Sequence, residues 1–151
     1  MLKTLFIAAM LLAGMAGTPA IAAPAEKKLT IDGNEMLAII NAINALGGYQ
    51  ELDRNRNAVS VHYTFSSQTI LTLADDRSRL VDAFKIVQEA AKAQFTKDKD
   101  HDDQVAKDIL AVKRDVSVIP IGVSELRLDQ NQGIPPGVVS DLRPILDGLD
   151  H

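Results

Sequence analysis

Apolar residues recur at helical spacing after Asp32 and share one face of a helix. Asp32 is a favourable N-cap residue, and Glu35 three positions later completes a capping-box pattern, in which each side chain accepts a hydrogen bond from a free backbone N–H. Gly47 and Gly48 follow, where glycine commonly ends a helix. The pattern predicts a helix over residues 33–46. Its apolar face consists of Met36, Leu37, Ile39, Ile40, Ile43 and Leu46.

Residues 59–65 follow a different pattern, in which apolar and polar side chains alternate. A period of two, carried by β-branched and aromatic residues, is typical of a half-buried strand. The polar residues 51–57 before it are predicted to form a turn, and residues 29–31 a brief earlier strand. The apolar face of the strand is Val59, Val61, Tyr63 and Phe65, and the polar face is Ser60, His62 and Thr64.

A long helix is predicted over residues 67–96, with Ser66 as its cap. Charges of opposite sign lie three or four positions apart on its outer face, where they support a helix. A charge-dense stretch follows, and a third helix is expected over residues 103–113. The apolar stripe of the long helix is Ile70, Leu73, Leu80, Phe84, Val87 and Ala91, continuing weakly to Phe95. The inward residues of the third helix are Val105, Ile109 and Val112.

The C-terminal third begins with a β-branched run over residues 116–121, which predicts a strand. Pro120 has no N–H to donate, so this strand is expected to lie at a sheet edge or to end there. Residues 124–133 are predicted to form a short strand or turn followed by a loop. Residues 134–137 then lead into a short final helix that runs through Leu142.

The order of these elements predicts an α+β fold in one small domain over residues 29–151. We expect a small antiparallel or mixed sheet covered by three to four helices. The chain contains no internal repeat and no low-complexity segment.

The N-terminus has the features of a secretory signal peptide. A positive charge at Lys3 precedes an uncharged, mostly apolar run over residues 5–15, and Ala20 and Ala22 give the small-x-small pattern that signal peptidase recognises. The apolar run is shorter than the ~18–20 residues that a membrane span requires. We therefore expect export with cleavage rather than anchoring in the membrane.

Cleavage after Ala22 would remove the signal peptide, residues 1–22, and leave residues 23–28 as a flexible leader. One of the 16 basic residues and none of the 20 acidic residues would be lost, so the remaining 129 residues would carry a net charge of −5. This length is enough for one domain with a core. The expected location is the periplasm or the exterior of a bacterial cell, without stable insertion in the membrane after cleavage.

Composition excludes several classes of partner. The acidic balance argues against nucleic-acid binding, which requires a concentrated basic face. The chain has no cysteine and no tryptophan, so its stability depends on packing without disulfides, and its core is expected to be aliphatic. We expect no cofactor, and a partner that is another periplasmic or envelope protein.

The segment Asp98–Asp103 is a weak candidate for binding calcium or zinc. A helix–loop–helix calcium site requires glycine at its sixth position and glutamate at its twelfth, and this chain has Asp103 and Ile109 there. A single histidine is also a poor basis for a zinc site. A solvated connection between helices explains the segment better, and no metal site is predicted. The weak candidate ligands are Asp98, Asp100, His101 and Asp102.

The sequence contains no recognisable catalytic arrangement. It has no cysteine nucleophile, no Gly-x-Ser-x-Gly elbow and no glycine-rich phosphate loop, so no catalytic residue is assigned. His62, on the polar face of the predicted strand, is the one histidine inside a predicted element. It leaves open the alternative of an enzyme or enzyme inhibitor whose site is assembled from His62, Asp53 and Arg56.

The last 90 residues resemble, at the level of pattern, certain small uncharacterised proteins found in phage and prophage gene sets. Those proteins combine a tyrosine-bearing strand, a long charged helix, an acidic connection, a valine-rich strand and a proline-led terminal helix. The resemblance implies no particular activity or site. The matching residues here are Tyr63 and Phe65, Asp115–Ile121, Glu125 and Leu126, and Ile134–Leu146.

Taken together, the sequence predicts an exported, non-catalytic binding or interaction protein. An enzyme or enzyme inhibitor with a site around His62 is the first alternative. A divalent-metal module that uses Asp98–Asp103 is the second.

Overall fold

The computed structural model describes residues 25–52 and 58–148, and they form an α+β domain. The predicted signal peptide and residues 23 and 24 of the predicted leader lie outside these residues. The four α-helices are α1 (Gly33–Leu46), α2 (Ser67–Lys92), α3 (Lys99–Leu110) and α4 (Pro136–Leu142). The strands are β1 (Lys27–Ile31), β2 (Tyr49–Leu52), β3 (Ala58–Val61), β4 (Arg114–Val118), β5 (Ile121–Gly122) and β6 (Leu146–Asp147). Two 3₁₀-helices are η1 (Val123–Leu126) and η2 (Arg143–Ile145).

The predicted first helix is confirmed, with the same bounds, as α1. The Asp32 carboxylate accepts hydrogen bonds from the backbone N–H groups of Asn34 and Glu35, at 2.8 Å and 2.9 Å. The Glu35 carboxylate in turn accepts the N–H of Asp32 at 2.9 Å, which completes the capping box. The start of α1 is thus fixed by side chains that lie within four residues of sequence.

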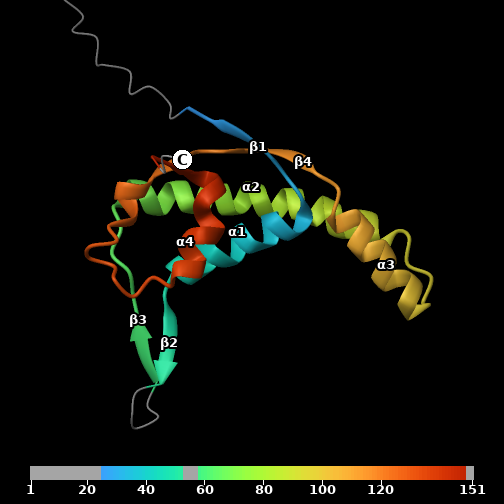
Figure 1. Ribbon diagram of the computed structural model, residues 1–151, viewed down its shortest axis with the longest axis horizontal. Coiled ribbons are helices and arrows are strands. Elements are labelled where there is room, and N and C mark those ends of the chain that lie inside the picture. Colours follow the sequence, from blue (N-terminus) through green and yellow to red (C-terminus); the bar gives the residue numbers. More distant parts are fainter. Residues whose placement is uncertain (1–24, 53–57, 149–151) are drawn as a thin grey trace, which may run out of the picture.

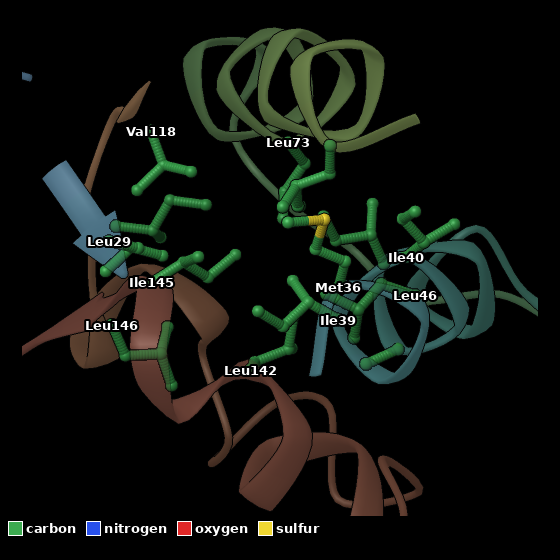
Figure 2. Close-up of a cluster of buried hydrophobic side chains, with 14 of the residues drawn as sticks. Leu29, Met36, Ile39, Ile40, Leu46, Leu73, Val118, Leu142, Ile145 and Leu146 are labelled. Carbon is green, nitrogen blue, oxygen red and sulfur yellow. The ribbon is translucent and has the colours of Figure 1, made fainter. Parts of the chain in front are cut away.

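The apolar face of α1 supplies much of the core. Met36 and Ile39 are almost fully buried, and α1 contacts α2, α3 and α4. Figure 2 shows labelled side chains from α1 and α2 meeting others from β1, β4 and the C-terminal segment in one cluster. Ile145 and Leu146, which follow α4, are buried in the same core.

The strands form three two-stranded pairings in the described residues, whereas one small sheet was predicted. β1 pairs antiparallel with β4, β2 with β3, and β5 runs parallel to β6. The β2–β3 pair cannot extend the β1–β4 pair, because it projects from the helices at the end where α1 stops (Figure 1). β4 ends before Pro120, in agreement with the prediction that proline would end this strand.

Several predicted bounds were wrong. Lys27 and Lys28, assigned to the flexible leader, belong to β1 and pair with β4. Part of the predicted turn at residues 51–57 belongs to β2, which was not predicted, and the following strand ends at Val61 rather than at residue 65. The short strand or turn expected after residue 124 belongs to η1.

The long helix ends at Lys92 rather than at residue 96, because the chain turns towards α3. The Asp102 carboxylate fixes this turn by accepting the backbone N–H groups of Thr96 and Lys97, and Lys97 has a positive φ of 76°. Asp98 caps α3, which therefore begins at Lys99 rather than at residue 103.

The predicted apolar faces were partly wrong as well. The exposed members are Leu37 at 41%, Ile70 at 52%, Phe95 at 45% and Val112 at 48%.

Two leucines on α2 provide a direct test of this packing. Leu80 is fully buried and Leu71 is 65% exposed. Leu80→Ala should lower the free energy of unfolding by about 2–5 kcal/mol, because it leaves a cavity in the core. Leu71→Ala makes the same chemical change on the same helix and should change stability by less than about 0.5 kcal/mol. Urea denaturation followed by circular dichroism measures both values, and similar losses in the two variants would contradict this placement of α2.

Candidate functional site

An apolar cleft of about 420 Å³ lies where α1 ends and α2 begins. Its walls come from the C-terminal half of α1, the N-terminal half of α2 and the segment that follows β3. The side chains of Leu46 and Leu73 are buried there, whereas Ile70 leaves half of its surface exposed. The lining residues are Ile43, Asn44, Leu46, Gly47, Tyr63, Phe65, Ile70, Leu73, Ala74 and Arg77.

A glycine turn brings the third wall into place. Gly48 has a φ of +101°, and a Cβ there would lie 2.6 Å from the carbonyl oxygen of Val61. Only glycine fits both the backbone angle and this close approach without strain. The chain can therefore leave α1 directly into β2 and return through β3 (Figure 1). Tyr63, just after β3, lines the same cleft as the end of α1.

Asn131 holds the Tyr63–Phe65 segment against the rest of the domain. Its side-chain oxygen accepts the N–H of Thr64 at 2.9 Å, and its amide group donates to the carbonyls of Thr64 and Leu126 at 3.1 Å and 2.8 Å. The Tyr63 hydroxyl donates to the carbonyl of Gly133 at 2.8 Å. Sequence reasoning missed Asn131, since a polar residue in a loop carries no sign that it will be buried.

Among the described residues of the lining, Arg77 is the one that is charged. Its Nε–H donates to the Asn44 side-chain oxygen at 2.5 Å, which joins α2 to the last turn of α1. Arg77 forms an ion pair with none of the described carboxylates. Arg79, two residues further along, pairs with both Glu26 and Asp75. The cleft therefore combines apolar walls with one cation at its rim.

A polar contact secures the start of α2 from another side. The Ser66 hydroxyl accepts the N–H of Thr69 at 3.1 Å and caps the helix. The buried Thr69 hydroxyl donates to the Glu125 carboxylate at 2.9 Å, and Glu125 also accepts the N–H of Gly122 at 3.2 Å. This network joins α2 to η1 and fixes the helix that forms one wall of the cleft.

Asp76 is a fully buried carboxyl group about two turns after Thr69 on α2. One of its oxygens accepts the N–H of Ile119 at 2.7 Å, and the other has no hydrogen-bond partner among the described residues. Burial raises the pKa of Asp76 to about 6, although the hydrogen bond from Ile119 and the charge of Arg79 act to lower it. Asp76 is absent from the cleft lining, and it anchors the chain that follows β4.

The candidate catalytic residues are only partly described. His62 is exposed, just after β3, and its Nδ1 would lie 3.1 Å from a Cβ built at Gly48. It is not a lining residue of the cleft. Asp53 and Arg56 lie outside the described residues, so the site proposed around these three side chains stays a prediction.

The acidic segment supplies the cap and the turn before α3. Asp98 accepts the N–H groups of Asp100 and His101, at 3.1 Å and 3.4 Å, and Asp102 binds the two N–H groups described above. Over the described ranges 25–52 and 58–148, no three His, Asp or Glu side chains are placed to hold one metal ion. The Asp98 and Asp102 side chains thus have structural roles at the start of α3.

A second, smaller cleft of about 240 Å³ lies between the C-terminal half of α2 and α3. Its walls are also apolar, with Phe84 and Phe95 from the α2 side and Leu110 from α3, and Lys92 at the edge. α3 has no buried residue, so this end of the molecule is less tightly packed than the end that holds the larger cleft.

No protein-family model matches the chain, and no significant match to it was found among curated proteins or solved structures. The similarity of the last 90 residues to small phage and prophage proteins therefore stays a prediction. Within the part of the chain that the structure describes, no helix is long and apolar enough to cross a bilayer.

Asp76→Asn should weaken the dependence of stability on pH. The pKa of Asp76 is raised from 3.8 to about 6 by folding, so between these values the folded protein holds a proton that the unfolded chain has released. The free energy of unfolding therefore falls as the pH rises through this window, by at most about 3 kcal/mol. Asparagine does not titrate, and the variant should lose this slope in urea denaturation measured from about pH 4 to about pH 7.

Asp82→Asn is the matched control, because it removes an exposed carboxylate from the same helix. It should retain the wild-type slope. Identical slopes in the wild type and in Asp76→Asn would contradict the raised pKa of Asp76.

Proposed function

We propose that the protein is an exported, non-catalytic binding protein that accommodates an apolar group in the cleft between α1 and α2. The observation that carries the proposal is the cleft itself, which is open and mostly apolar and has two polar side chains at its rim. Small-molecule sites typically have volumes of about 300–1,000 Å³ and this kind of lining. A volume of about 420 Å³ is within that range.

The chemistry of the lining favours binding over catalysis. Tyr63 and Arg77 are the titratable residues among those that line the cleft, all of which are described. The Tyr63 hydroxyl donates to a backbone carbonyl, and a guanidinium has donors but no acceptor. Neither residue is suited to act as a general base near neutral pH, where histidine and carboxylates usually serve.

The proposal of export depends on the N-terminal sequence. A charged start, an apolar run too short to span a bilayer and the small residues before Ala23 are the features of a cleaved signal peptide. Mass spectrometry of the protein recovered from a bacterial periplasm tests this directly. A mature chain that begins at Ala23 would support the proposal, and an intact N-terminus in the cytoplasm would contradict it.

Ala74→Leu should block the cleft without disturbing the core. Ala74 is an exposed residue of α2 that lines the cleft, so a leucine there adds an apolar side chain where the ligand would lie. Decanol, a neutral apolar probe, should bind the wild type and shift the amide NMR signals of Tyr63, Phe65 and Ile70. In Ala74→Leu its affinity should fall about tenfold or more, the effect of losing about 1.4 kcal/mol of binding free energy.

Ser78→Leu is the matched control. It adds a leucine one turn further along α2, at an exposed position outside the lining, and should leave decanol binding unchanged. Failure of decanol to bind the wild type, or equal weakening in both variants, would contradict the assignment of the cleft as the binding site.

A further inference from the structure

Resting on the proposed function of the cleft, we propose that its ligand is a small amphipathic monocarboxylate, with the carboxylate on Arg77 and the apolar part against Ile70 and Phe65. The Arg77 cation and the apolar walls belong to one cleft.

The charge at the rim has no carboxylate of its own among the described residues. Arg77 makes its hydrogen bond to the neutral amide of Asn44, and the ion pairs in the described part of the chain involve other residues. Arg79, on the same helix, shows the usual arrangement here, because Glu26 and Asp75 neutralise it. No described residue of the cleft lining is acidic, so an anion that enters meets attraction without a competing carboxylate from the described residues.

The geometry of Arg77 suits a carboxylate. A guanidinium has five N–H donors, and the bond to Asn44 uses the one on Nε. The two terminal nitrogens have no hydrogen-bond partner among the described residues, and as a parallel pair they have the arrangement that binds both oxygens of a carboxylate. Asn44 also restricts the side chain, so less conformational entropy is lost when the anion binds.

The apolar part of the ligand has a defined surface to cover. Ile70 is 52% exposed although it faces the same cleft as the buried Leu73, and Phe65 is half-buried on the opposite wall. Removing such apolar area from water is favourable by about 25 cal/mol per Å². An aliphatic or aromatic group attached to the carboxylate would gain this contribution while its charge stays at the rim.

Arg77 also contacts the last turn of α1, and the experiment must separate the effect of this contact on stability from ligand binding. The last turn of α1 contains no basic residue, and a cation is favourable at the negative end of a helix. This contact predicts that loss of Arg77 lowers stability. It does not predict that Arg77 selects an anionic ligand over a neutral one.

The test compares three probes with the same ten-carbon chain, all used below the concentrations at which they form micelles. Decanoate should bind the wild type about tenfold or more tighter than decanol, because charge-assisted hydrogen bonds are stronger than neutral ones. Decyltrimethylammonium should bind more weakly than decanol. Isothermal titration calorimetry gives the three affinities, and added salt should reduce the preference for decanoate.

Arg77→Gln should abolish this preference, so that decanoate binds no tighter than decanol. Lys85→Gln is the matched control, because it removes the same charge from an exposed position of the same helix outside the cleft. It should retain the preference. Thermal unfolding of both variants reports any loss of stability separately.

The outcomes are distinct. Equal binding of decanoate and decanol to the wild type would overturn the assignment of the ligand class and leave the cleft as an apolar site. Binding of none of the three probes would overturn the proposed function itself. A preference for decanoate that survives in Arg77→Gln would show that another group selects the anion, and would also overturn the inference.

Discussion

The burial of the apolar face of α1 is the contact on which the rest of the structure depends. α1 touches α2, α3 and α4, and its side chains Met36 and Ile39 lie at the centre of the core. The chain contains no cysteine and no tryptophan, so neither a disulfide nor a large indole ring supplements this aliphatic packing. The capping box at Asp32 fixes where α1 begins, and the glycine turn at Gly48 fixes how the chain leaves it.

The packing of α2 and of the segment after β3 beside the end of α1 also forms the cleft. Its walls are the end of α1, the start of α2 and the segment that Asn131 holds beside them, and Ile70 on α2 is left half exposed. Each wall has its own fixed contact: Gly48 near the end of α1, Thr69 and Glu125 at the start of α2, and Asn131 at the segment after β3. A cleft whose walls are fixed separately is preformed, which reduces the free energy lost when a ligand binds.

The sequence could predict α1 because a capping box, a helical apolar pattern and terminal glycines all indicated the same bounds. It predicted the start of α2 for similar reasons, but its end depends on Asp102, a residue of the next helix. The apolar stripe did not reveal that Ile70 would be exposed, because a pattern identifies apolar residues without showing what covers them. For the candidate site, Arg77 and Asn131 gave no signal, since their roles come from contacts with distant residues. The end of α2, the exposure of Ile70 and the contacts of these two residues therefore required the tertiary structure.

Asp76 fixes the position of the segment after β4 along α2. Apolar packing against α1 is weakly directional, so it does not alone fix the position of the chain after β4 along α2. β4 ends at Val118 before Pro120, and Ile119 donates its N–H to the buried carboxylate of Asp76. Burying that carboxylate raises its pKa and destabilises the folded protein near neutral pH. The hydrogen bond it forms is directional, however, and holds one flank of α2 while Arg77 and Ile70 on another flank face the cleft. The charge of Asp76 is thus unfavourable in the core near neutral pH. Its hydrogen bond with Ile119 nevertheless holds the helix that carries the proposed ligand contacts.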